Sequence, residues 1–168
     1  MNRWIVAALR AVIAIALLGS LAVQGLMIPL ALRDMDGTRT EIRVAFAVLV
    51  FVGVLGLQLI GVSTWRLLTM VRRGTVFSFG AFRYVDRIIA AISVGAVVVF
   101  GFAVLGAYSN RTNPGDEVAP GLVGMVCVLA LVVGGVALLV YVLRTLLTQA
   151  VALDDETKHL QAELAEVI

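Results

Sequence analysis

The sequence predicts an all-α membrane protein: four transmembrane helices in two hairpins packed as a bundle, a short interfacial helix in the central loop, and a helical C-terminal tail. Hydrophobic residues make up 61% of the chain and its mean hydropathy is +1.06, whereas soluble domains contain roughly 45–50% apolar residues. Charged residues account for only 14% of the chain and are confined to a few short stretches. The 168 residues are therefore expected to form a single integral membrane domain, residues 1–168.

Residues 11–32 form the first predicted span, because no charged side chain lies between Arg10 and Arg33. At about 1.5 Å per residue this run makes roughly 33 Å of helix, enough to cross a hydrocarbon core of about 30 Å. A cleaved signal peptide is the alternative, but its apolar region is only about 7–15 residues long. We therefore expect a retained first span.

Three further apolar runs predict spans at about residues 44–64, 88–108 and 122–142. Trp65 and Arg66 follow the second span, as interfacial residues commonly do. The polar loops between the runs are rich in turn-forming residues. Because nothing breaks the last helix after the fourth span, we expect it to continue as a cytoplasmic tail, residues 144–168.

The central stretch, residues 66–87, separates the two hairpins and carries five of the thirteen cationic residues and one acid, Asp86. Gly74 ends the preceding helix, and Ser78 is a suitable N-cap for a new helix that starts at Phe79. Aromatic side chains occupy one face of this helix and arginines another, which is typical of an interfacial helix; a basic turn that only sets topology is the alternative. The candidate partner-binding or lipid-binding residues here are Arg66, Arg72, Arg73, Phe77, Phe79, Phe82, Arg83 and Arg87.

The cationic residues are distributed unequally between the two ends of the spans. The end that holds both termini and the central stretch has nine of them, and the other end has four. Because cations near the ends of spans favour the cytoplasmic side, both termini and the central stretch are expected in the cytoplasm.

The predicted spans contain no Asp, Glu, Lys, Arg or His. Such residues are usual in proton relays, ion paths and intramembrane catalysis, so their absence argues against those functions. The sequence also lacks a phosphate-binding motif, a catalytic Ser/His/Asp set and metal-ligand spacing around its single cysteine, Cys127. We therefore expect no enzymatic activity, no catalytic, cofactor-binding or metal-binding residue, and no cofactor.

Gln24 and Gln58 are the polar side chains of most interest inside the spans. They lie on adjacent predicted spans, so their amides are expected to hydrogen-bond across the two helices. Such bonds average about 0.6 kcal/mol in membrane proteins. A substrate-binding role for the two glutamines is the alternative.

The tail has a seam of mostly apolar residues at alternating four-residue and three-residue steps, as in a coiled coil. These positions are Leu146, Ala150, Leu153, Thr157, Leu160, Leu164 and Val167. The pattern predicts binding to a soluble partner or to a second copy of the chain, with Leu153, Leu160 and Leu164 as candidate contacts. A solvated helical extension without a partner is the alternative.

The start of the tail is acidic and is expected on the same side of the membrane as the basic central stretch. We expect Asp154, Asp155 and Glu156 to lie against Arg72, Arg73 or Arg83. A single exposed ion pair contributes only about 0–1 kcal/mol, so this latch would be weak and sensitive to salt. Binding of the arginines to anionic lipid is the alternative.

Several of these features resemble a known family. The four spans, the GTVFSF segment at residues 74–79 and the charged tail after LRTLLTQAV resemble the bacterial domain-of-unknown-function 2975 (DUF2975) family. Its Gly-x-x-Phe-Ser element is matched by Gly74, Phe77 and Ser78, whereas the helical end of the tail departs from the shorter acidic segment of many members. The resemblance implies a small inner-membrane protein that is often encoded beside a small helix-turn-helix regulator.

Together these observations predict a non-enzymatic inner-membrane binding or regulatory module that presents a basic loop and an acidic helical tail to the cytoplasm. The expected partners are the lipid bilayer, a second copy of the chain or, from the resemblance, a helix-turn-helix regulator; no direct binding of nucleic acid is expected. A small transporter or pore subunit is the alternative function, and it would act as an oligomer because one set of spans offers no polar path.

Overall fold

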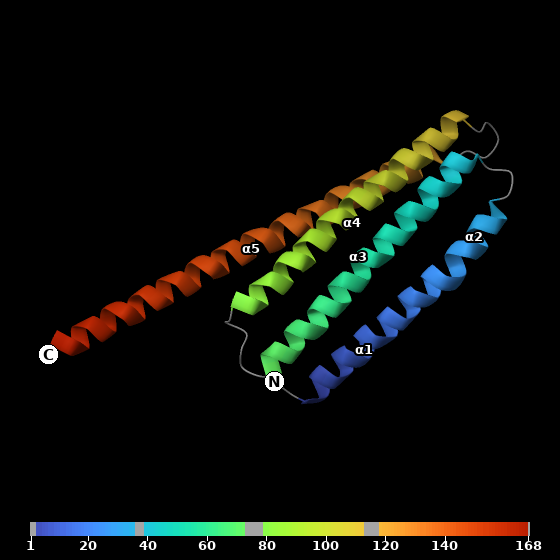
Figure 1. Cartoon of the computed structure of the whole chain (residues 1–168). Helices are drawn as coiled ribbons and strands as arrows, with labels where there is room; N and C mark the ends of the chain where they lie inside the picture. The colour runs from blue at the N-terminus through green and yellow to red at the C-terminus, as the bar shows by residue number, and fades with distance from the viewer. Residues whose placement is uncertain (1–2, 36–38, 73–78, 113–117, 168) are drawn as a thin grey trace.

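The computed structural model describes residues 3–35, 39–72, 79–112 and 118–167, and these residues are almost entirely helical (Figure 1). The first helix, α1 (Arg3–Ala22), continues through a π-helical turn, η1 (Val23–Met27), into α2 (Ile28–Asp34). Three longer helices follow: α3 (Thr40–Arg72), α4 (Phe79–Thr112) and α5 (Pro120–Val167). No strand occurs within the described ranges, so the all-α prediction is confirmed.

Within the described residues, four segments are long and apolar enough to cross a membrane: Ala7–Asp34, Thr40–Met70, Arg83–Thr112 and Pro120–Gln161. Each contains one predicted span. Few of the described side chains in these segments are buried within the protein, and those that are include small residues such as Ala91, Ala103 and Ala137. Because most large apolar side chains remain exposed, this is a multi-pass membrane protein whose surface requires lipid as its solvent.

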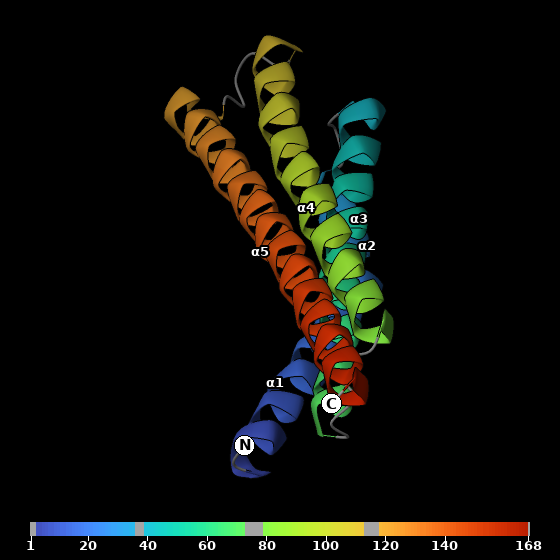
Figure 2. The same ribbon diagram turned by 90° about the vertical axis from the view of Figure 1, so that its left-hand side faces the viewer.

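Successive spans run antiparallel and form an open row in the order α1, α3, α4 and α5 (Figures 1 and 2). The contacts of α3 with α4 and of α4 with α5 are extensive, whereas α1 and α2 pack mainly on α3. The four helices are therefore present as expected, but they are arranged more openly than a closed bundle. The reason is that α4 packs closely against both α3 and α5, whereas α1 packs mainly against α3 and so lies at the edge of the row.

Small residues account for the close approach of α3 and α4. A Cβ atom at Gly101 would lie 2.7 Å from Leu49 Cδ2, and one at Gly53 would lie 3.3 Å from Val98 Cγ1. Phe46 and Phe102 pack edge to face across the same seam, with ring centroids 5.8 Å apart. In lipid, where the hydrophobic effect does not drive helices together, such van der Waals packing sets which faces meet.

The start of α4 differs from the simplest expectation. A helix starts at Phe79 as predicted, but it is continuous with the third span and forms the first turns of α4, because nothing after Gly80 breaks the helix before the span. The last helix, in contrast, continues through the tail as expected. With 48 residues, α5 is about 72 Å long, more than twice the hydrocarbon thickness of about 30 Å.

The π-helical turn η1 has a local cause in Pro29. Proline has no N–H to donate to the carbonyl four residues earlier, and its ring crowds that carbonyl. The backbone N–H of Ile28 bonds instead to the carbonyl of Val23, five residues earlier. The wider turn therefore absorbs the proline without ending the span, and it contains Gln24.

Candidate functional site

At one end of the row α1 begins, α3 ends, α4 begins and α5 leaves the other helices (Figure 1). Many charged residues belong to these parts of the helices. We call this the arginine-rich end and define it by Arg10, Arg66, Arg83, Arg87 and Arg144. Among the described residues, this end holds two polar contacts between helices that the sequence did not predict, and a third polar contact lies deeper between α1 and α3.

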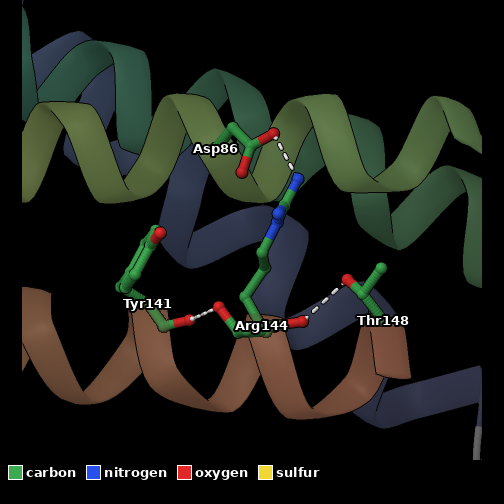
Figure 3. Close-up of polar contacts among 5 residues, drawn as sticks. Asp86, Tyr141, Arg144 and Thr148 are labelled. Carbon is green, nitrogen blue, oxygen red and sulfur yellow. Dashed lines mark hydrogen bonds and ion pairs between the residues drawn. The ribbon is translucent and has the colours of Figure 1, made fainter. Parts of the chain in front are cut away.

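An ion pair joins α4 to α5 at the arginine-rich end. Arg144 Nη2 lies 2.9 Å from Asp86 Oδ2 (Figure 3). The Arg144 side chain is 29% exposed and that of Asp86 is 49% exposed. From the sequence, Asp86 was expected only as the single acid of the central stretch; its position among arginines was the available signal that it neutralises one of them.

A second contact joins α1 to α3. The Arg10 guanidinium lies over the Trp65 ring, with Cζ 5.6 Å from the ring centroid, and Nη2 donates to Thr69 Oγ1 at 3.2 Å. Thr69 in turn donates to the carbonyl of Trp65 at 3.0 Å. We call Arg10, Trp65 and Thr69 the Arg10 cluster. Arg10 was expected to act only as a topology signal, and its contact with Trp65 was not predicted.

The two predicted intramembrane glutamines are hydrogen-bonded across α1 and α3. Gln58 Nε2 donates to Gln24 Oε1 at 3.0 Å and also to Ser20 Oγ at 3.0 Å. Ser20 donates to the carbonyl of Leu17 at 2.7 Å. Gln24 Nε2 is buried and has no hydrogen-bond partner within the described part of the chain. We call Ser20, Gln24 and Gln58 the glutamine cluster. Its hydrogen bonds give most of its polar side-chain atoms a partner in apolar surroundings, and they join α1 to α3.

The basic candidates of the central stretch do not converge on one pocket in the described ranges. Arg66, Arg83 and Arg87 are exposed. The guanidinium of Arg87 lies over the ring of Tyr84, with Cζ 5.2 Å from the ring centroid. Arg73 and Phe77 lie outside the described residues. The structure places three others at helix termini without describing their side chains: Arg72 at the end of α3, and Phe79 and Phe82 at the start of α4.

The tail candidates lie on the part of α5 that extends past the other helices (Figure 1). Leu153 and Leu160 are exposed, and Leu164 belongs to α5 but its side chain is not described. Their apolar surface is therefore uncovered at the two positions that the structure describes.

The expected latch between the acidic tail and the central arginines is not formed among the described side chains. Asp154 pairs with Lys158 of its own helix, one turn later, and neither Asp154 nor Glu156 pairs with Arg83 among the described side chains. The local pair forms because residues four apart on a helix are neighbours. The side chain of Asp155, like those of Arg72 and Arg73, lies outside the described part of the structure.

Among the residues that the structure describes, no three or more His, Cys, Asp or Glu side chains lie together so that they could hold a metal ion. Cys127 is a half-buried free thiol on α5. The candidate functional features are therefore the exposed apolar seam of α5 and the polar contacts between helices.

The family that the sequence resembles is the one that matches the chain. The family model described as "Protein of unknown function (DUF2975)" matches residues 5–168, so the chain belongs to this family. Searches of curated proteins and of solved structures returned no match to the chain.

Proposed function

We propose that this DUF2975 member is a non-enzymatic module of the bacterial inner membrane that binds a cytoplasmic partner through the extension of α5. The family is described only as one of unknown function, so the support for this proposal comes from the residues of the chain. The nine-to-four distribution of cations supports the orientation, with both termini and the arginine-rich end in the cytoplasm.

The observation that carries the proposal is an uncovered apolar seam on α5. Leu146, Leu153 and Leu160 recur every seven residues and are 55%, 64% and 53% exposed. The helix is more than twice as long as the membrane core of about 30 Å, so the residues after Arg144 extend beyond the span. Burying a leucine side chain contributes about 1.5–3 kcal/mol, and a helix partner that covers this seam would gain that energy at several positions.

Charge favours a basic helical partner over a second copy of the chain. The extension from residue 145 onward carries five acidic residues and one lysine. Two such extensions side by side would bring like charges together, whereas a helix with an apolar seam and basic flanks would complement both properties. A small helix-turn-helix regulator, as the family resemblance implies, is a candidate that could present such a helix.

The test is site-specific photo-crosslinking in the native membrane. A photoreactive side chain at position 153 on the seam is expected to crosslink to a partner, and the same group at position 152, off the seam, is expected to crosslink weakly. The seam variant Leu153→Asp/Leu160→Asp should lose the crosslinked species formed from position 146. The matched variant Ala152→Asp/Gln161→Asp adds the same charge off the seam and should retain it.

The transporter alternative has less support from the described residues. A groove of about 510 Å³ along α3 and α4, which Val133 of α5 also lines, is surrounded only by Val, Leu, Ile, Ala, Gly and Phe. A polar solute would need hydrogen-bonding groups along its path, so further copies of the chain would have to supply them.

Equal crosslinking from positions 152 and 153, with no effect of either double variant, would refute the partner proposal.

A further inference from the structure

We propose that an anionic phospholipid binds between α1 and α3, with its phosphate at Arg10 and one acyl chain in the groove below. The inference rests on the Arg10 cluster and on the space beside it, and it is independent of any partner of the tail. The site differs from Arg66, Arg83 and Arg87 of the central stretch, which are exposed side chains outside the Arg10 cluster.

The charge of Arg10 is not balanced within the described part of the protein. Its contacts there are Thr69 and the ring of Trp65, and no carboxylate pairs with it. The side chain is half-buried, and Nε is buried without a hydrogen-bond acceptor. A cation that is partly withdrawn from water and has no counter-ion is costly, and a phosphate diester is an acceptor that the planar guanidinium can bind through two N–H groups.

The depth of Arg10 suits a headgroup. Arg10 immediately precedes the uncharged run of the first span, and Trp65 follows the second predicted span. Tryptophan is enriched at the headgroup level of membranes, and here the guanidinium lies over its ring. Thr69 orients Arg10 from the adjacent turn of α3, so the cation is held in place before a ligand arrives.

A largely apolar groove lies on the span side of this cluster, along the neighbouring turns of α1 and α3. It has a volume of about 290 Å³ and lies between α1 and α3, with Ile13 and Ala16 on one wall and Leu57 and Ile60 on the other. Its deeper part reaches Ser20 and Gln58 of the glutamine cluster. The groove follows the helix axes away from Arg10, which is the direction that an acyl chain takes from its phosphate.

The two observations together select a phospholipid as the occupant. A soluble phosphate would balance Arg10 but leave the groove unfilled, and an apolar helix from another chain would fill the groove but supply no anion. A phospholipid with a net negative charge supplies both. The positive charge of Arg10 also predicts a preference for an anionic over a zwitterionic headgroup, since one basic residue near an anionic surface gains about 1 kcal/mol, or roughly fivefold in affinity.

Trp65 provides the probe, because the chain contains two tryptophans and the other, Trp4, can be replaced by phenylalanine. The Trp4→Phe protein is reconstituted in phosphatidylcholine vesicles with chain-brominated phosphatidylglycerol or chain-brominated phosphatidylcholine. Bromine quenches tryptophan fluorescence on contact. We expect phosphatidylglycerol to occupy the site about fivefold more favourably than phosphatidylcholine.

Variants separate the site from general surface charge. Arg10→Gln should reduce the preference to near onefold, whereas Arg66→Gln removes the same charge from an exposed neighbour of Trp65 and should leave it unchanged. Arg10→Lys should retain part of the preference, and it keeps the test usable if Arg10→Gln lowers insertion or helicity. Ala16→Leu narrows the groove and should reduce quenching by both brominated lipids.

Several results would overturn the proposal. Equal quenching by the two lipids in the Trp4→Phe protein would remove the anionic site. Equal losses in Arg10→Gln and Arg66→Gln would indicate only surface charge. Competition by millimolar inorganic phosphate would indicate an anion site without a lipid chain. Unchanged quenching in Ala16→Leu would exclude the groove as the position of the chain.

Discussion

The Asp86–Arg144 ion pair is the clearest interhelical electrostatic contact that can be tested by mutation. We expect Asp86→Asn and Arg144→Gln each to loosen the packing of α4 on α5 at the arginine-rich end. The two side chains come from different helices (Figure 3), and Asp86 lies near the start of α4, beyond which α5 extends past the row (Figure 1). Loss of the pair should therefore affect the direction of the extension as well as stability.

The magnitude follows from distance and exposure. Two unit charges about 4 Å apart attract by about 4 kcal/mol at an effective dielectric constant of about 20. Desolvation and screening offset most of this, because the side chains are 29% and 49% exposed. Exposed pairs typically contribute about 0.2–1 kcal/mol, and we expect a coupling near the upper end of that range for this partly buried pair.

A double-mutant cycle in detergent or bicelles measures the coupling. Arg144 has interactions besides the pair with Asp86, so the loss in a single variant overstates the contact, and only the coupling term isolates it. The reversed pair Asp86→Arg/Arg144→Asp should recover stability relative to either single reversal and leaves the cation count unchanged. Additive losses, with a coupling below about 0.2 kcal/mol, would refute the assigned role.

Three further predictions concern orientation, the glutamine cluster and the loop between α4 and α5. Reporter fusions after Gly80 and Ile168 should report the cytoplasm and fusions after Gly37 and Gly115 the exterior; an exterior signal from Gly80 would reverse the topology. Gln58→Leu should lower stability by about 0.6–1.7 kcal/mol in unfolding from mild detergent, because it removes interhelical hydrogen bonds. The Asn110 amide accepts from Val118 N and donates to Val118 O, both at 2.7 Å, so Asn110→Ala should cost about 1–3 kcal/mol, and an unchanged melting temperature would contradict this.

The control for the glutamine prediction is an amide placed on an exposed part of α3. Leu59 is 44% exposed and follows Gln58 directly, so Leu59→Gln measures the effect of an added polar group alone. In contrast, Gln58→Leu removes the bonds to Gln24 and Ser20. A Gln58→Leu protein as stable as the wild type would show that the cluster contributes nothing to holding α1.

The sequence determined the membrane-spanning class and the location of the spans. Runs of about twenty uncharged residues leave few alternatives in a medium where every backbone polar group must be bonded within its own helix. The pairing of Gln24 with Gln58 could also be predicted from the sequence. Two amides on neighbouring helices of an antiparallel hairpin have few other partners inside the membrane. The continuous tail followed from the lack of a helix-breaking residue after Arg144.

The tertiary structure alone decided which faces of the helices meet. Hydropathy places a residue at a depth but says nothing about rotation of the helix around its axis, and lipid-facing and helix-facing residues are equally apolar. The approach of Gly101 to Leu49 sets the rotation of α4 against α3.

That rotation, with the crossing of α5, brings Asp86 to Arg144 across 58 positions of sequence. The edge position of α1 likewise places Arg10 over Trp65 and leaves a groove below them, because a helix packed on only one neighbour is not enclosed by the others. These contacts depend on side chains from helices that are distant in sequence, and hydropathy carries no information about such pairs.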